Sequence, residues 1–349
     1  MTAALPLKKI VLTFLASLLV VSILAFSAFA QERGDQTTGG TTGKIGIQVS
    51  SPIYNATIDP GGSYQDTIKV RNVSDTPQTF YPEVFDFRPS GETGTPEFIL
   101  NGDAQSYTYS LASWINISKV GIKLEPNKST ALNFVINVPK NAEPGGRYAG
   151  ILFGTSPPHT DGSQIAISNK VGSIVLVRVS GAAKEVATVK EFSTPKNFYT
   201  TPPVDFVARI QNSGSVHVIP KGTIDIKDTF GRKVATLPVN EKNGNVLPES
   251  IRRFDKDSSN LVWNPGGFTV GRYTATLSLN YGSPAKALTA EVTFWVIPWV
   301  QLIIAALTLI ILILLLIFLV KRYNKWIVEK AEKRPAQGGK DPDNSSTGG

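Results

Sequence analysis

Residues 273–281 read YTATLSLNY and residues 288–296 read LTAEVTFWV, and these two stretches decide the fold. In each stretch every second residue is apolar, while the residues between are mostly Thr, Ser, Asn or Glu. Successive side chains of a strand point to opposite faces of its sheet, so the pattern predicts two strands with one buried face each. Shorter runs of the same kind occur earlier, at residues 120–124, 132–138 and 204–210.

Turn-forming sequences separate these runs. Examples are Pro60-Gly61-Gly62, Pro126-Asn127-Lys128 and Pro265-Gly266-Gly267. No amphipathic helical pattern is recognisable between residues 44 and 296. Many short strands, each buried on one face, predict an all-β ectodomain made of antiparallel, immunoglobulin-like β-sandwiches.

The second of the two strands leads directly into an uncharged segment, residues 297–320. A helix of that length is roughly 36 Å long, enough to cross a hydrocarbon core of about 30 Å. Lys321, Arg322 and Lys325 follow at once, and positive charge favours the cytoplasmic side. We therefore expect a single-pass, type I cell-membrane protein with an extracellular ectodomain and a basic, then disordered, cytoplasmic tail at 321–349. A buried helix of a soluble protein would need a partner covering every face.

The N-terminus agrees with export. Lys8 and Lys9 precede an apolar run, and Ala28-Phe29-Ala30 provides a small-x-small cleavage pattern, which predicts a signal peptide at residues 1–30. An uncleaved anchor is the alternative, since the apolar run is slightly long. Residues 31–45 are rich in Gly and Thr and predict a flexible linker.

The ectodomain is long enough for two domains, which we place at residues 46–181 and 182–296. A weak internal repeat supports this division. Residues 70–74 resemble 210–214, where each strand ends at an Asn turn, and Gly146-Arg147-Tyr148 resembles Gly271-Arg272-Tyr273. Chance similarity among strands is the alternative reading. Cysteine is absent, so each domain must be held by its own core.

The chain carries little that points to catalysis. It has two histidines, His159 and His217, far apart in sequence, and no cysteine. No phosphate-binding loop, dinucleotide fingerprint or Gly-x-Ser-x-Gly motif is present. The formal net charge of +8 lies mostly in the leader and the tail, which gives little support to nucleic-acid binding. We expect no cofactor, no metal, no nucleic-acid partner and no enzymatic activity, with an unrecognised hydrolase in the first domain as a rival.

One aromatic cluster stands out. Residues 80–87 read FYPEVFDF, with Phe80, Pro82 and Val84 on one side of a strand. On the other side lie Tyr81, Phe85 and Phe87. The first set should be core; the second is our candidate binding face, unless other parts of the chain cover it.

The first domain resembles the WxL-interacting protein family of Gram-positive surface proteins. The resemblance rests on Pro60-Gly61 with residues 67–72 (TIKVRN), and on residues 111–114 (LASW), 124–126 (LEP), 134–139 (FVINVP), 142–148 (AEPGGRY) and 151–155 (ILFGT). Signal peptide, two sandwiches and a C-terminal span match that family's plan, while the second domain fits more loosely. The resemblance implies a peptidoglycan-binding first domain, a second domain that contacts host matrix, and partners carrying Trp-x-Leu motifs.

These observations favour a membrane-anchored bacterial surface protein that binds or scaffolds at the cell wall, with peptidoglycan or other surface proteins as partners. The alternative is an accessory subunit or chaperone of a secreted or membrane complex, acting through the exposed edge of a β-strand.

Overall fold

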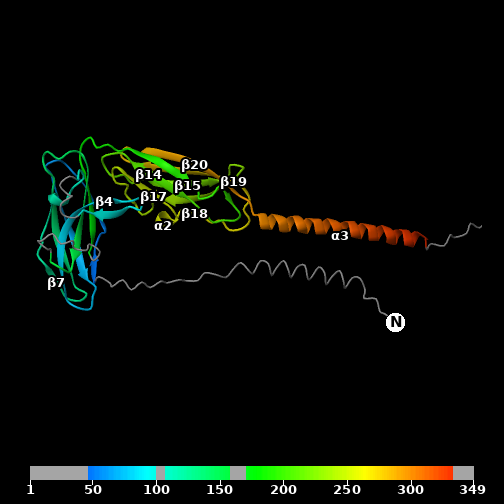
Figure 1. Ribbon diagram of the computed structural model, residues 1–349, viewed down its shortest axis with the longest axis horizontal. Helices are drawn as coiled ribbons and strands as arrows, with labels where there is room; N and C mark the ends of the chain where they lie inside the picture. Colours follow the sequence, from blue (N-terminus) through cyan, green and yellow to red (C-terminus); the bar gives the residue numbers. More distant parts are fainter. Residues whose placement is uncertain (1–45, 100–106, 158–169, 333–349) are drawn as a thin grey trace, which may run out of the picture. The chain divides into compact units, whose positions relative to one another are not determined.

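The computed structural model describes residues 46–99, 107–157 and 170–332. Its strands form two groups of sheets, one before and one after Gly181, and a single long helix follows them (Figure 1). The prediction of an all-β ectodomain followed by an apolar C-terminal helix is confirmed. The predicted signal peptide, the linker and the tail beyond residue 332 lie outside the described residues.

The first sandwich pairs two sheets, ordered β1-β3-β8-β6 and β2-β10-β9-β4-β5, with β7 also pairing with β4. Its elements are β1 (Ile47–Val49), β2 (Ile53–Ile58), β3 (Ser63–Asn72), β4 (Gln78–Ser90), β5 (Thr95–Phe98), the 3-10 helix η2 (Ala112–Trp114), β6 (Ile115–Ile117), β7 (Ile122–Leu124), β8 (Ser129–Asn137), β9 (Gly145–Gly154) and β10 (Val171–Val179).

The core of the first sandwich contains the inward-facing residues of both sheets, among them Ile68, Phe80, Phe134 and Ile151, none of which is exposed. Strand β9 is buried along its whole length. One of its faces packs on this core, and its other face is covered as well. The predicted run at 120–124 is shorter than expected, because β7 begins at Ile122 and leaves Val120 exposed.

The second sandwich has sheets ordered β11-β14-β17 and β12-β20-β19-β15-β16, and a separate pair β13-β18. Its elements are β11 (Ala187–Ser193), β12 (Phe198–Tyr199), β13 (Val204–Asp205), β14 (Val207–Asn212), β15 (Lys221–Lys227), β16 (Lys233–Val239), β17 (Ser250–Phe254), α2 (Lys256–Ser259), β18 (Val262–Trp263), β19 (Gly271–Tyr281) and β20 (Lys286–Val296).

The core of this sandwich is aromatic, with Phe294 packed against Phe206, Trp263 and Tyr273 at ring-centroid distances of 5.7–5.8 Å. The predicted strands at 273–281 and 288–296 form the β19–β20 hairpin, whose predicted inward residues face this core. Helix α2 is a single turn capped by Asp255 and Ser258, too short to leave an amphipathic pattern in the sequence.

Two strand pairs are parallel, against the purely antiparallel sheets that the sequence predicted. They are β2 with β10 and β12 with β20. In each sandwich the last strand thus has a parallel neighbour on its outer side. Period-two alternation marks a half-buried strand without telling the direction of its neighbours, so the sequence pattern could not distinguish the two cases.

The internal repeat has a physical basis in two buried asparagines. The Asn72 amide donates to the carbonyls of Thr76 and Leu124, and its Oδ1 accepts from the Ser74 N–H, all within 2.8–2.9 Å. The equivalent residue, Asn212, donates to Val216 and Val246 and accepts from Gly214, each at 2.9 Å. Each asparagine therefore closes a turn and ties it to a distant segment, which random strand similarity would not produce.

Helix α3 (Trp299–Glu332) follows β20 after two residues. The most apolar 18 residues within its part from Trp299 to Glu329 have a mean hydropathy of 3.5 and no buried share, so the helix is long and apolar enough to cross a membrane. The helix extends to Glu332, past the predicted end of the span at Val320.

Candidate functional site

The predicted binding face on β4 is largely covered. Tyr81 is half-buried against Gly121, where a Cβ atom would lie 2.5 Å from the tyrosine ring. Phe85 is half-buried, with the Lys170 ammonium 5.0 Å from its ring centroid. Phe87 is only 2% exposed. The expectation that the three rings share one open face is therefore wrong for Phe87, which packs against the second sandwich.

Phe87 belongs to a small apolar cluster that joins the two sandwiches. Its fully or nearly buried members are Phe87 on β4, Tyr148 on β9, Leu176 on β10 and Leu247 from the β16–β17 loop. Leu247 is the contribution of the second sandwich, placed among residues of three strands of the first. The outer face of the first sandwich's larger sheet is thus used as a packing surface for its neighbour.

Polar contacts surround this cluster. The Tyr148 hydroxyl accepts the backbone N–H of His217 at 2.9 Å and lies 3.3 Å from its Nδ1. The Gly146 N–H donates to the Ser215 carbonyl at 2.8 Å. Burial, and then the positive charge of Arg178, lower the pKa of His217 to about 4. Burial also raises the pKa of Tyr148. His217 is therefore neutral at physiological pH.

The tip of the β4–β5 hairpin reaches the second sandwich. The Glu92 carbonyl accepts the Arg253 N–H at 2.8 Å, and the Glu92 carboxylate accepts from Arg209 Nε at 2.7 Å. The hydrogen bond from Arg209 lowers the pKa of Glu92. Gly94 follows with φ +78°, and a Cβ there would lie 2.4 Å from Arg252 Cζ. Glycine at 94 therefore allows the hairpin to close over Arg252.

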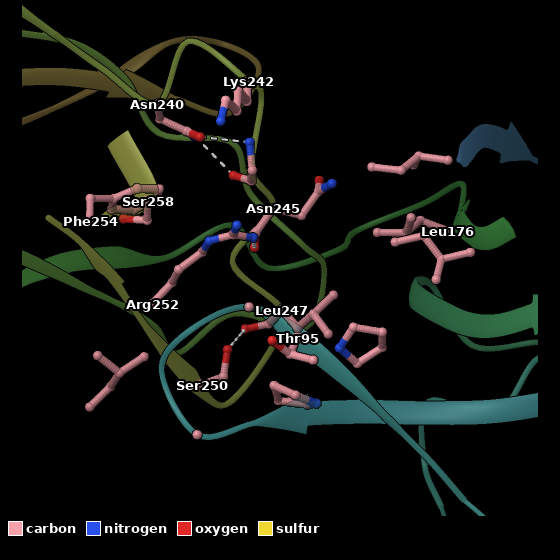
Figure 2. Close-up of a pocket in the computed structure, with 18 of the residues that line it drawn as sticks. Thr95, Leu176, Asn240, Lys242, Asn245, Leu247, Ser250, Arg252, Phe254 and Ser258 are labelled. Atoms are coloured by element: carbon pink, nitrogen blue, oxygen red, sulfur yellow. Dashed lines mark hydrogen bonds between the residues drawn. The ribbon is translucent and has the colours of Figure 1, made fainter. Parts of the chain in front are cut away.

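Between this hairpin, β10 and the β16–β17 loop lies a cleft of about 200 Å³. Its apolar wall includes Ile53, Phe87 and Leu176 of the first sandwich. Its polar wall comes from the second sandwich and includes Lys242, Asn245, Ser250 and Arg252. Figure 2 shows the Arg252 guanidinium reaching from β17 towards Asn245 across the polar wall.

Arg252 is a cation without an acidic partner among the described residues. Its Nη1 donates to the Asn245 carbonyl at 2.8 Å, and its guanidinium lies 5.6 Å from the Phe254 ring centroid. Neither the buried Arg252 Nε nor the buried Asn245 Oδ1 has a hydrogen-bond partner among the residues that the structure describes. Burial lowers the pKa of Arg252. None of the described residues that line the cleft is Asp or Glu, and Lys242 adds a second positive charge.

This arrangement is suited to binding an anion and lacks a group for acid–base chemistry. The guanidinium cannot act as a base, because an arginine in a protein stays protonated. The Ser250 hydroxyl donates to the Leu247 carbonyl, and the Ser258 hydroxyl donates to the Asp255 carboxylate at 3.0 Å as part of the cap of α2. No histidine lines the cleft among the described residues. Across the described ranges no group of three His, Cys, Asp or Glu residues is placed to hold a metal.

Sequence reasoning missed Arg252 and Asn245. A signal did exist, because Arg252 and Phe254 are two apart on one strand, and Phe254 is in the core. Arg252 therefore lies on the inward face of β17. A charged side chain on a buried face costs free energy unless another group pairs with it, so the pattern indicated a partner for Arg252. The partner surface comes from Gly94 and its neighbours, far away in the sequence, so the pattern alone could not show a cleft.

No family model and no curated protein matches this chain. Among solved structures, the Pseudomonas aeruginosa CupB2 chaperone is similar over 70% of this chain and 98% of its own, with 11% identity and a TM-score of 0.32. The E. coli chaperone DraB matches 70% of this chain and 98% of its own, with 14% identity and a TM-score of 0.30. A Porphyromonas gingivalis protein of unknown function covers the same shares, with 14% identity and a TM-score of 0.27. The function must therefore be inferred from the cleft itself.

Proposed function

We propose that this protein is a membrane-anchored bacterial surface protein that binds without turnover, holding an anionic partner group in the cleft between its two sandwiches. Helix α3 supplies the anchor, with the sandwiches outside the cytoplasmic membrane and the basic residues after Val320 inside. The observation that carries the proposal is the Arg252 guanidinium, which lines the cleft. In the described part of the chain its buried Nε has no hydrogen-bond partner, and no carboxylate lines the cleft beside it.

The chemistry of the cleft indicates the kind of group that would fit. A carboxylate would pair with the guanidinium through charge-assisted hydrogen bonds, which are roughly twice as strong as neutral ones. An N–H donor next to that carboxylate would satisfy Asn245 Oδ1. The apolar wall formed by Ile53, Phe87 and Leu176 would accommodate a small apolar side chain. An amino-acid residue with a free carboxylate has all three features.

The resemblance to the WxL-interacting family supports a partner in the cell wall, either peptidoglycan or a wall-associated protein. Both can present such a group: a peptidoglycan stem peptide ends in a D-alanine carboxylate, and a protein ends in an L-residue carboxylate. N-acetyl-D-alanyl-D-alanine and N-acetyl-L-leucine are minimal probes of the two sources, and N-acetyl-L-leucinamide is a neutral control.

Calorimetric titration of the ectodomain, residues 46–296, tests the proposal. At least one of the two acids should bind, and the neutral amide should bind more weakly. Arg252→Met should abolish the difference between acid and amide, because it keeps the apolar stem and removes the charge. Arg253→Met is the matched control, since the Arg253 side chain is exposed and pairs with Asp255 instead. Equal binding of acid and amide to the wild-type protein would contradict the proposal.

A second function, pairing of a partner strand with an exposed edge, is favoured by β16. This strand of seven residues forms a ladder only with β15 among the described residues and has exposed side chains at its start. A partner that adds a strand there would protect the amides of residues 234–237 from hydrogen exchange. A ligand in the cleft would leave these amides unchanged, so exchange measured with wall extracts separates the two functions.

A further inference from the structure

The exposed apolar side chains of the second sandwich gather at one end. In residues 182–298, all of which the structure describes, seven large apolar side chains are exposed: Val186, Phe198, Phe230, Val234, Phe268, Val270 and Trp295. All but Val186 lie at the end of the sandwich from which α3 leaves. Single exposed apolar residues are ordinary on a protein surface, whereas such a gathering indicates an interaction site.

The strand register brings these residues together. Gly271 at the start of β19 pairs with Val296 at the end of β20, so Phe268 and Val270 lie just before that point. Phe198 on β12 pairs with Trp295. The β15–β16 turn belongs to the same end, because Lys227 pairs with Thr274 near the start of β19.

Phe230 is displayed by a rigid turn. It is 83% exposed, the highest value of these residues. The Asp228 carboxylate accepts the backbone N–H groups of Phe230 at 2.9 Å and Arg232 at 3.0 Å. The neighbouring Thr229 hydroxyl donates to the Arg272 carbonyl at 2.9 Å, which ties the turn to β19. The fold therefore holds an apolar ring in water, where the Arg232 guanidinium lies 5.6 Å from the ring centroid.

Only Ile297 and Pro298 separate β20 from α3. Two residues span at most about 7 Å. The connection is also fixed to the sandwich, since the Ile297 N–H donates to the Tyr199 carbonyl at 2.8 Å. If α3 crosses the membrane from Trp299, the end of β20 must lie within a few ångströms of the interfacial layer, whereas Phe230 and Phe268 reach that layer only when the sandwich is tilted towards it.

Charge at this end suits an anionic surface. Asp205, Asp225 and Asp228 each lie in an ion pair with a lysine or arginine. In contrast, the exposed Lys196, Lys227 and Arg272 form no ion pair within 4 Å in the part of the chain that the structure describes. Basic residues are attracted to an anionic lipid surface.

We propose that this end of the second sandwich docks on the outer leaflet of the membrane that holds α3, with Phe198, Phe230 and Phe268 entering the headgroup layer. Phenylalanine rings leave water by burying into the boundary between headgroups and acyl chains. Trp295, which pairs with Phe198, is of a residue type enriched at membrane interfaces. The ectodomain would then stand in a fixed orientation on the membrane instead of swinging on a tether. The inference rests on the membrane anchor of the proposed function and is independent of the cleft.

Fluorescence quenching of the full chain tests this docking. The chain has no cysteine, so single cysteine variants carry one label each. Gly266→Cys places a fluorophore beside Phe268, where a Cβ meets no atom within 4 Å. Val186→Cys is the control at the opposite end, and Leu312→Cys lies within the apolar helix. The protein is reconstituted in bilayers of phosphatidylglycerol and phosphatidylcholine, with and without nitroxide-labelled phosphatidylcholine.

The inference expects a loss of fluorescence for the labels at 266 and 312 and none at 186. Adding Phe198→Ser, Phe230→Ser and Phe268→Ser should restore the fluorescence at 266 while leaving 312 quenched; melting curves confirm that this variant folds. An unquenched label at 266 with a quenched label at 312 overturns the docking and leaves the anchor. Quenching at 266 that survives the triple substitution also overturns it, because the tether alone would then explain proximity. An unquenched label at 312 refutes the anchor and the docking together.

Discussion

Acid should loosen the contact between the sandwiches through His217. The pKa of this residue falls from 6.5 to about 4 in the folded state, because burial and the charge of Arg178 oppose protonation and the nearby Glu185 offsets them only in part. The unfolded chain therefore binds the proton more tightly than the folded one. The stability due to neutral His217 is fully present above the unfolded pKa and is lost as the pH falls from 6.5 towards 4. At 1.36 kcal/mol per unit, the full loss is about 3 kcal/mol, most of which is reached near pH 4.5.

Denaturant unfolding of the ectodomain, followed by tryptophan fluorescence at neutral pH and near pH 4.5, measures this loss. Carboxylates with lowered pKa values, such as Glu92 and Glu185, also cost stability in acid, so a control is needed. His217→Gln provides it, since glutamine is neutral throughout and keeps the backbone N–H that Tyr148 accepts. The wild-type protein should lose about 2–3 kcal/mol more than this variant. Equal losses in the two proteins would refute the role assigned to His217.

Three further predictions concern the contact between the sandwiches (the joint, formed by Phe87, Tyr148, Leu176 and Leu247), the β4 face and the anchor. Leu247→Ala should lower the free energy of unfolding by about 2–5 kcal/mol, as for other buried leucines, and an unchanged denaturant midpoint would show that the joint adds no stability. Tyr81→Ser with Phe85→Ser should weaken attachment to isolated cell walls without changing the melting curve, if these half-buried rings are a contact face; unchanged attachment with unchanged melting would remove them from consideration. Protease added to intact spheroplasts should remove the ectodomain and spare an epitope placed after Lys340, and loss of that epitope without lysis would reverse the topology.

The sequence predicted the strands well wherever a single face is buried. At 204–210 the alternation named Val204, Phe206, Ala208 and Ile210, and all four are fully buried. The turns at Asn72 and Asn212 could be recognised because the residues around each asparagine, 70–74 and 210–214, are similar in sequence. Each of these features is local, involving residues a few positions apart, and local patterns are what a single sequence can show.

The contact between the sandwiches and the cleft within it were beyond the sequence. Arg209 and Glu92 are 117 residues apart, and Tyr148 and His217 are 69 apart, so no spacing connects them. Phe87 illustrates the difficulty. Alternation correctly placed its ring on the face opposite the first core, but an outward-facing ring can meet solvent, a ligand or another domain. Only the position of Leu247 decides among these.

The joint and the cleft also depend on one another. The hairpin that carries Glu92 and Gly94 is held by Arg209 and by the Arg253 N–H, and by closing there it buries Arg252. Burying an unpaired charge opposes folding, so the apolar cluster and the ion pairs of the joint must offset that cost. A ligand carboxylate that pairs with Arg252 removes the cost and should stabilise the joint as it binds. Arg252→Met removes the same cost without a ligand. The variant should therefore be at least as stable as the wild-type protein while having lost the preference for a carboxylate, a combination expected of a residue kept for binding and not for folding.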